Sequence, residues 1–174
     1  MNISIFCIFV VLLIGGCASN SYEELSDIPD LENVKKLPKV NIISPAGYDY
    51  YQYIFKDLEV FEEVLAGYTD EGLEIRIQRD SSPVNQEASA GSLMISAATL
   101  FLVPAVGQFE ESLHFSVYED AKKIKTYSYS TKKYLSVGLF SSSDSVDDST
   151  ISKKIDTDII KVFIGEFSED YHQL

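Results

Sequence analysis

The chain begins with an apolar run that limits which residues can take part in the fold. Residues 3–14 are almost all apolar, and Gly15, Gly16 and Cys17 follow them directly. A run of this length is too short to cross a bilayer as a permanent helix, but it suits the core of a secretory signal peptide. We therefore expect residues 1–16 to be removed and the fold to be built from the rest of the chain.

The end of this run carries a resemblance to a known class of proteins. Ile14, Gly15, Gly16 and Cys17 resemble the lipobox of bacterial lipoproteins, in which an aliphatic residue and two small residues precede a cysteine. The resemblance implies cleavage between Gly16 and Cys17, and attachment of lipid, including palmitate-type acyl chains, to the Cys17 sulfur. Ala18 stands where an aspartate would favour the inner membrane of Gram-negative bacteria. The resemblance therefore implies the periplasmic side of the outer membrane, with the inner membrane or the cell surface as alternatives.

Charge and cysteine content restrict the partners and the means of stabilisation. The chain has 27 acidic and 14 basic side chains and a formal net charge of −13, which argues against nucleic acid as a partner. Loss of Cys7 with the signal and lipidation of Cys17 would leave no cysteine pair for a disulfide. We expect a lipidated cysteine and flexible tether over residues 17–39, followed by one domain over residues 40–174 that is held by its core.

Hydrophobic periodicity predicts an α+β domain. Alternating or β-rich runs predict strands at residues 40–43, 73–78, 113–118 and 124–129, with 134–140 extending the last strand or adding another. Apolar residues at helical spacing predict helices at residues 50–65 and 149–169. This order favours a two-layer sandwich, in which a mainly antiparallel sheet of about four to five strands carries two helices on one face.

Residues 88–109 contain no charged side chain, and two interpretations of this segment compete. Its length is compatible with a transmembrane helix, but its many small residues and Pro104 weaken that interpretation. We favour a buried strand at residues 99–103 that ends at Pro104 and follows a loop of small residues. A membrane span would divide the domain between two compartments and leave neither half a sufficient core.

The predicted layout over residues 40–169 resembles two small envelope modules. These are LptE, the lipoprotein of lipopolysaccharide export, and the amino-terminal domain of the translocation protein TolB. The run from Ala98 to Ala105 also resembles a stretch of uncharacterised small bacterial lipoproteins. Because the resemblance to the two modules rests on the order of the elements, it implies a fold and a compartment but no reaction.

The sequence contains no recognisable catalytic set. Its two histidines are His114, on the predicted outer face of a strand, and His172, near the end of the chain. Neither has an obvious nucleophile or orienting group, and the acidic clusters lack the spacing of a calcium loop. We expect no enzymatic activity, no metal site and no cofactor.

Tyrosines are abundant, and two clusters of them are candidates for a contact surface. The candidates are Tyr50, Tyr51, Tyr53, Tyr127, Tyr129 and Tyr134. Packing within the domain is the alternative role for these side chains. We expect a non-enzymatic envelope lipoprotein, attached to the membrane by its lipid, that binds another envelope protein as an assembly or accessory factor.

Two other functions stay open. The protein could be a membrane-active or lipid-handling lipoprotein that uses residues 88–109. It could also be an immunity lipoprotein whose acidic surface neutralises a basic toxin.

Overall fold

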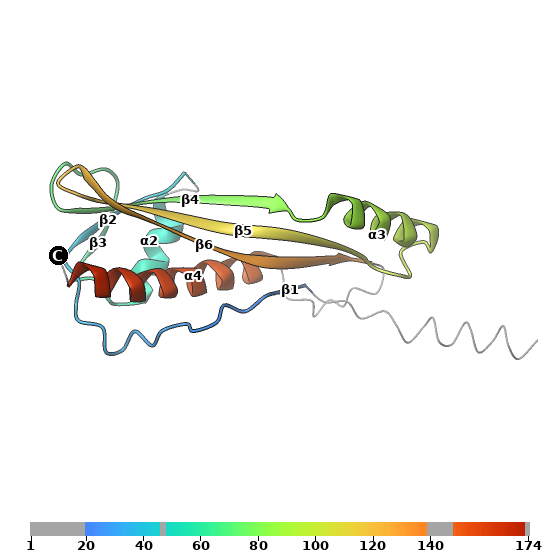
Figure 1. The fold of residues 1–174 in the computed structure, drawn as a ribbon, viewed down its shortest axis with the longest axis horizontal. Helices are drawn as coiled ribbons and strands as arrows, with labels where there is room; N and C mark the ends of the chain where they lie inside the picture. The colour runs from blue at the N-terminus through green and yellow to red at the C-terminus, as the bar shows by residue number, and fades with distance from the viewer. Residues whose placement is uncertain (1–19, 46–47, 139–147, 173–174) are drawn as a thin grey trace, which may run out of the picture. The chain divides into compact units, whose positions relative to one another are not determined.

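The computed structural model describes residues 20–45, 48–138 and 148–172. Within them lie six strands and three helices (Figure 1). The strands are β1 (Ser21–Tyr22), β2 (Val40–Ile43), β3 (Val64–Ala66), β4 (Leu73–Pro83), β5 (Ala105–Glu119) and β6 (Lys122–Val137). The helices are α2 (Tyr48–Asp57), α3 (Gln86–Ala98) and α4 (Asp148–Tyr171). The predicted cleavage and lipidation residues, Gly16 and Cys17, lie outside the described residues.

The six strands form one mixed sheet in the order β1-β6-β5-β4-β2-β3. β2 is parallel to both β3 and β4, whereas β1 is antiparallel to β6. The α+β class was predicted, but a mainly antiparallel sheet of four to five strands with two helices is wrong. The sheet is mixed because α2 carries the chain from β2 back to β3, which must then run in the same direction as β2. The helix that the sequence did not predict is α3.

The predicted helix over residues 50–65 is also corrected. α2 ends at Asp57, and Glu59 has a positive φ of 53° that turns the chain out of the helix. Val64 and the two residues after it then pair with β2 as strand β3. Leu65 fits the helical spacing of the preceding residues, yet the open edge of β2 offers it backbone hydrogen bonds that outweigh this preference.

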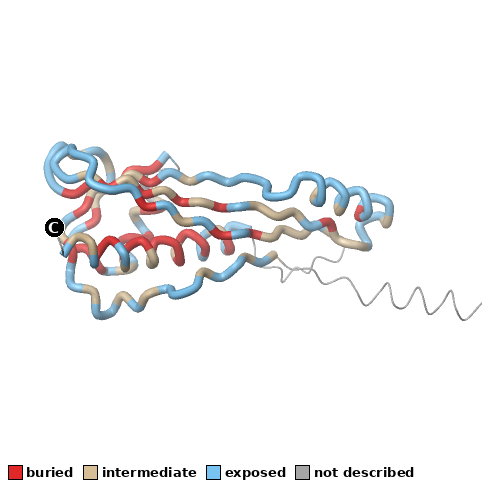
Figure 2. Tube along the Cα trace, in the orientation of Figure 1, coloured by how far each residue is buried: buried red, intermediate tan, exposed pale blue. Residues whose placement is uncertain are grey.

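The chain divides into two compact units. Unit 1 consists of Met1–Glu23, Ser82–Glu110 and Lys132–Ser152, and unit 2 consists of Glu24–Ser81, Glu111–Thr131 and Lys153–Leu174. The core of unit 2 lies between α4 and the sheet, where Phe115 of β5 stacks on Phe163 of α4 with ring centroids 4.2 Å apart. Figure 2 shows buried residues concentrated on α4, and exposed residues along most of α3.

Alternation along the strands gives unit 2 one buried face and one open face. Ile75, Ile77, Phe115 and Val117 are buried, and the residues between them are mostly half-buried or exposed. Such alternation is typical of strands with one face packed on the core and the other turned toward solvent. β5 and β6 form a hairpin, and its two turn residues, Asp120 and Ala121, both have positive φ.

The turn at Asp120 and Ala121 joins β5 directly to β6. Positive φ at two successive residues is the geometry of a type I′ turn, which joins antiparallel strands directly. The Gly72 N–H donates to Asp120 Oδ1 over 2.8 Å, and the Asp120 N–H donates to the Gly72 carbonyl over 3.0 Å. These bonds hold an aspartate and an alanine in a conformation that usually favours glycine or asparagine.

Unit 1 overturns the predicted buried strand at residues 99–103. The small residues before it form α3, whose Ala88 N–H donates to Asn85 Oδ1, and the chain then turns through Leu100 and Phe101, both with positive φ. Alanine, serine, leucine and methionine together support a helix once Asn85 has started it. Among the described helices, none combines the length and the apolar character that a membrane crossing requires.

Candidate functional site

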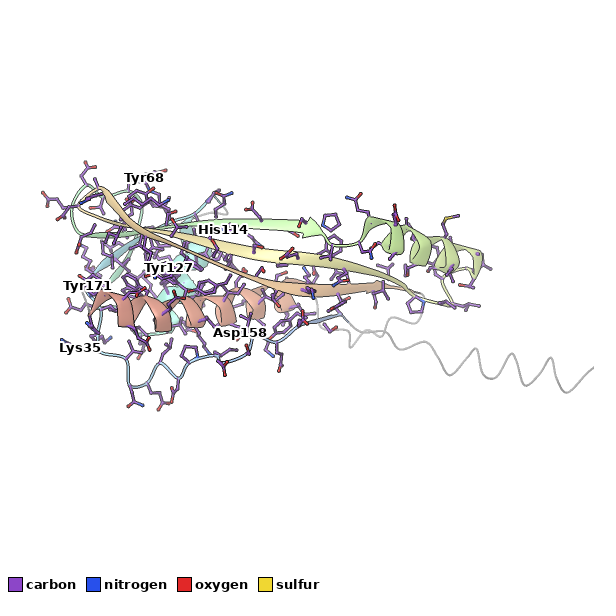
Figure 3. The ribbon with its side chains drawn as sticks, in the orientation of Figure 1. Lys35, Tyr68, His114, Tyr127, Asp158 and Tyr171 are labelled. Atoms are coloured by element: carbon purple, nitrogen blue, oxygen red, sulfur yellow. The ribbon has the colours of Figure 1, made fainter. Side chains whose placement is uncertain are left out.

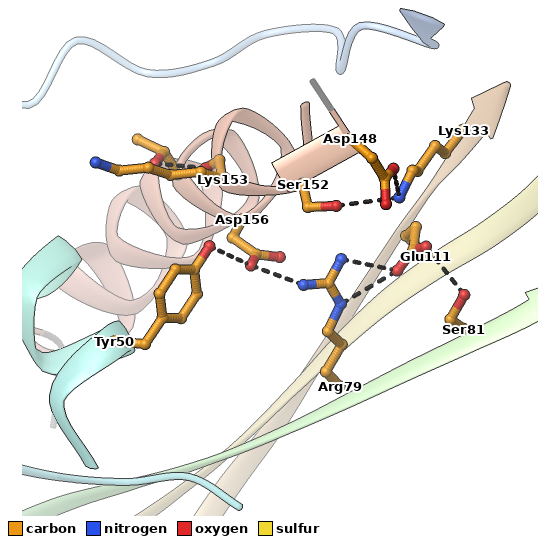
Figure 4. A network of polar contacts seen from close by, with 10 residues as sticks. Tyr50, Arg79, Ser81, Glu111, Lys133, Asp148, Ser152, Lys153 and Asp156 are labelled. Atoms are coloured by element: carbon orange, nitrogen blue, oxygen red, sulfur yellow. Dashed lines mark hydrogen bonds and ion pairs between the residues drawn. The ribbon is translucent and has the colours of Figure 1, made fainter. Parts of the chain in front are cut away.

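A buried ionic network in unit 2 centres on Arg79 of β4 (Figure 4). Its guanidinium donates to Glu111 Oε2 through Nε at 3.1 Å and Nη2 at 3.0 Å, and to Asp156 Oδ2 through Nη1 at 3.1 Å. Ser81 Oγ donates to Glu111 Oε1 over 2.9 Å, and the Tyr50 hydroxyl donates to Asp156 Oδ2 over 2.8 Å. Both carboxylates are buried, so each depends on these donors in place of water.

The electrostatics keep the network in one protonation state. Burial lowers the pKa of Arg79, but Asp156 and Glu111 raise it further, so the net shift is upward. Burial and the charge of Asp156 raise the pKa of Tyr50 and of Tyr51. The Tyr51 hydroxyl is buried and makes no hydrogen bond within the described part of the chain. Arg79 therefore joins β4, β5 and α4 as a permanent cation, which suits a structural clamp and not proton transfer.

The structure distributes the predicted contact tyrosines among different surroundings. Tyr50 and Tyr51 belong to the interior around Arg79, as described above. Tyr53 is 59% exposed, and Lys153 Nζ lies 5.4 Å from the centroid of its ring. The first tyrosine cluster therefore presents mainly Tyr53 at the surface.

The tyrosines of the second cluster, Tyr127, Tyr129 and Tyr134, also have different surroundings. Tyr127 is buried and Tyr129 half-buried, and their hydroxyls donate to Asp170 and Glu166 of α4 over 2.7 Å and 2.6 Å. Tyr134 is half-buried in unit 1. The structure does not gather the six tyrosines into one surface.

The contact between β6 and the end of α4 yields a pH prediction. Lys125 Nζ and the Tyr127 hydroxyl donate to Asp170 Oδ2 over 2.6 Å and 2.7 Å, and these bonds lower the pKa of Asp170 below its ordinary value of 3.8. Because the folded state favours the carboxylate, its stabilising contribution is complete above pH 3.8 and is lost as pH falls through the lower folded value. Asp170→Asn should reduce the acid dependence of the unfolding free energy, measured by urea titration between pH 5 and pH 2.

Glu169→Gln is the matched control, because it removes the same charge from the position next to Asp170. An acid dependence that is identical in Asp170→Asn and the unaltered protein would contradict this assignment.

The open sheet face of unit 2 carries a cluster that sequence reasoning missed. Arg76 Cζ lies 4.0 Å from the centroid of the Tyr118 ring and 5.4 Å from that of Tyr68, and Arg76 Nε donates to Glu74 Oε1 over 2.6 Å. Tyr68 is 70% exposed. We call Tyr68, Arg76 and Tyr118 the Arg76 cluster.

His114, labelled with Tyr68 in Figure 3, alternates with the buried Leu113 and Phe115 and so lies on the open face. His114 was predicted on the outer face, and its ring nitrogens lie 2.8 Å from Ser128 Oγ and 3.2 Å from Asp80 Oδ2. The described residues contain no group of three histidine, cysteine, aspartate or glutamate side chains that could hold a metal ion. The open face is thus a polar surface with an exposed aromatic and cationic cluster.

Unit 1 exposes a second surface, of opposite character. Large apolar side chains of α3 and the turn after it are open to solvent, and we call them the apolar tip: Leu93, Met94, Ile95, Leu100, Phe101 and Leu102. Met94 is 73% exposed and Leu100 75% exposed. Contiguous exposed apolar residues of this kind mark sites of contact with proteins or membranes.

No family model matches the chain, and no curated protein matches it. Several solved structures resemble it. A minor lipoprotein from Acinetobacter baumannii shares 12% identity and a TM-score of 0.44 over 76% of this chain and 92% of that chain. An uncharacterised lipoprotein B from Nitrosomonas europaea shares 8% identity and a TM-score of 0.49 over 87% and 93%.

A rare lipoprotein B from Shewanella oneidensis shares 9% identity and a TM-score of 0.32 over 78% of this chain and 91% of that chain. All three of these structures are bacterial lipoproteins, the class that residues 14–17 resemble. At these identities and TM-scores, the likeness carries no information on activity or partners.

Proposed function

We propose that the protein is a non-enzymatic envelope lipoprotein that binds another envelope protein as an assembly or accessory factor. Cys17 carries the lipid anchor, and the outer membrane is the proposed location, on its periplasmic side. The proposal assigns no reaction to the chain. Its support in the sequence is the lipobox-like segment Ile14 to Cys17.

The observation that carries the binding role is the Arg76 cluster. Tyrosine and arginine are the side chains that most often dominate the energy of protein interfaces. Here Tyr118 and Glu74 hold the guanidinium of Arg76 in place before any partner arrives, at 4.0 Å and 2.6 Å. A side chain that is already fixed loses less conformational entropy on binding. The open face is therefore suited to a protein partner.

Photo-crosslinking tests this role in intact cells. A benzophenone amino acid in place of Tyr68 should yield one discrete crosslinked product in the membrane fraction, which mass spectrometry can identify. The same substitution at Tyr53 is the matched control, because Tyr53 is exposed to a similar extent, 59% against 70%, and lies outside the cluster. The control should yield no corresponding product.

Arg76→Ala should remove most of the Tyr68 crosslink, because it removes the cation that Tyr68 and Tyr118 flank. Loss of an arginine that acts as an interface hot spot weakens binding by about 2 kcal/mol or more, which is roughly thirtyfold. Equal crosslinking from Tyr68 and Tyr53, or a Tyr68 product unaffected by Arg76→Ala, would refute the Arg76 cluster as the binding surface.

A further inference from the structure

We infer that the apolar tip inserts into the lipid leaflet that holds the Cys17 anchor, so that unit 1 docks on the bilayer surface. The occupant of this surface is lipid, and the inference rests on the proposed lipid anchor. It adds a second point of membrane contact to the covalent one. Three observations on unit 1 support it.

The first observation is the inverted polarity of α3. Ser89, Ser92 and Ser96 recur at helical spacing and are half-buried or buried, and Ser92 Oγ accepts from the Val106 N–H over 2.8 Å. On the opposite side Met94 is 73% exposed, with alanine and glycine around it. A helix that turns its hydroxyls toward its own unit and its aliphatic side chains outward has the polarity expected next to hydrocarbon.

The second observation is that the N–H groups of the turn are all satisfied locally. Every N–H from Thr99 to Val103 donates within the segment, over distances of 2.6–3.2 Å. The acceptors are the carbonyls of Ile95, Ala97, Ser96 and Thr99, and Thr99 Oγ1. Pro104, the next residue, has no N–H to satisfy. A backbone N–H without a partner is costly in lipid, so this turn brings no unpaired N–H into the interface.

The third observation is the length of chain between the anchor and unit 1. Ser21 of β1 pairs with Tyr134 of β6, and the Ser136 N–H donates to Asn20 Oδ1 over 3.0 Å. Ser21 lies four positions after Cys17, so the two residues can be at most about 14 Å apart. Tyr134 lines a cavity of about 280 Å³ together with residues of α3, among them Ala88 and Ser92. The anchor therefore holds the unit that carries the apolar tip close to the bilayer.

Charge gives the insertion a direction. Glu87 in the first turn of α3 is the last charged residue before the tip, and no charged residue follows until Glu110. Leu100 lies thirteen positions after Glu87, and α3 spans most of that stretch. Leu100 and its neighbours enter the leaflet, while Glu87 stays among the head groups or in water.

The absence of tryptophan from the chain allows a direct test. The lipidated full chain is purified with a single Leu100→Trp or Met94→Trp substitution and reconstituted into phosphatidylcholine vesicles. The matched control is Tyr68→Trp, because Tyr68 has a similar exposure of 70% and belongs to unit 2. Both tip variants should shift their emission to shorter wavelength and be quenched by brominated acyl chains, with the bromine closest to the head groups most effective.

The Tyr68→Trp emission should not change with bromination. The unlipidated domain, produced with Cys17→Ser, should bind the same vesicles weakly. An added Leu100→Asp should lower its partition coefficient into the vesicles on the order of tenfold. Circular dichroism of each variant shows whether it is folded, and Met94→Asp provides a second variant should Leu100→Asp fail to fold.

The results separate the inference from the proposed function. A protein that floats with the vesicles while its tip tryptophans remain in water would overturn tip insertion and leave the anchor intact. A tip signal that appears only with membrane protein present, and not with lipid alone, would also overturn it and would assign the tip to a protein partner. A protein that fails to float would refute the anchor instead.

Discussion

Replacing Cys17 with serine should transfer the protein almost completely from the membrane fraction to the soluble fraction. A serine hydroxyl cannot take the place of the thiol that receives the lipid, so the anchor is lost. Each buried methylene of an acyl chain contributes about 0.8 kcal/mol to membrane attachment, and stable attachment needs more than one chain. Cell fractionation with intact mass measurement checks both the location and the missing lipid.

Cys7→Ser is the matched control for this experiment. Cys7 is the chain's other cysteine, and it lies in the segment that we expect to be removed. This variant should keep both the lipid and the membrane location. A Cys17→Ser protein that stays in the membrane fraction without lipid would contradict the anchor and would make the apolar tip the principal membrane contact.

Arg79→Ala should lower the free energy of unfolding by about 3–5 kcal/mol, since it leaves two buried carboxylates without their shared cation. Arg79 donates to both Glu111 and Asp156 over 3.0–3.1 Å. Urea denaturation followed by circular dichroism measures the change. This is the largest stability effect that we expect from removing a single polar side chain of the described residues.

Arg76→Ala is the matched control, because Arg76 and Arg79 are the chain's two arginines and both pair with carboxylates. The Arg76 side chain is 42% exposed, whereas that of Glu74 is 2% exposed. The Thr69 N–H also donates to Glu74 over 2.9 Å. Arg76→Ala removes the cation from one buried carboxylate and not from two, so it should cost less than Arg79→Ala. A second control removes the charges together as Arg79→Met, Glu111→Leu and Asp156→Leu, and should cost less than Arg79→Ala alone. Equal losses in Arg76→Ala and Arg79→Ala would contradict the buried clamp.

The elements predicted correctly are those whose local pattern agrees with their packing. The β-rich run at residues 40–43 is strand β2. Ile151, Ile155 and Ile159 repeat at helical spacing, and all three are buried on α4. In each case the side chains that form the pattern are the ones that enter the core, so burial strengthens the local preference.

The elements that were missed are those in which the local sequence pattern and the packing disagree. Leu93, Met94 and Ile95 are consecutive and apolar, so they form no stripe at helical spacing and do not indicate a helix. The helix nevertheless forms, because its hydroxyl-bearing side faces unit 1. β3 has only three residues, and its existence depends on the open edge of β2, which a local sequence pattern does not contain.

The ionic network could not be derived from sequence spacing, because 32 and 77 residues separate Arg79 from Glu111 and Asp156. A signal for it does exist. Arg79 continues the buried alternation of Ile75 and Ile77, and Glu111 begins the buried alternation of Leu113 and Phe115. Charged residues at inward positions of two strands indicate a buried pair, although they do not identify Asp156 as the third member.

The short strand β1 sets the radius within which a protein anchored at Cys17 can move. Its attachment to β6 consists of the Ser21–Tyr134 and Tyr22–Lys133 pairs and the Glu23 N–H bond to Lys132, with Asn20 beside them. The next fully buried residue along the chain is Leu37, twenty residues from Cys17. If β1 and the residues up to Leu37 detach from the fold, the maximum length of the chain between Cys17 and the folded protein increases from about 14 Å to about 70 Å. The hydrogen bonds of β1, the Glu23–Lys132 and Glu24–Lys154 ion pairs and the Lys36 bond to the Glu59 carbonyl thus set how far from the bilayer the protein can reach.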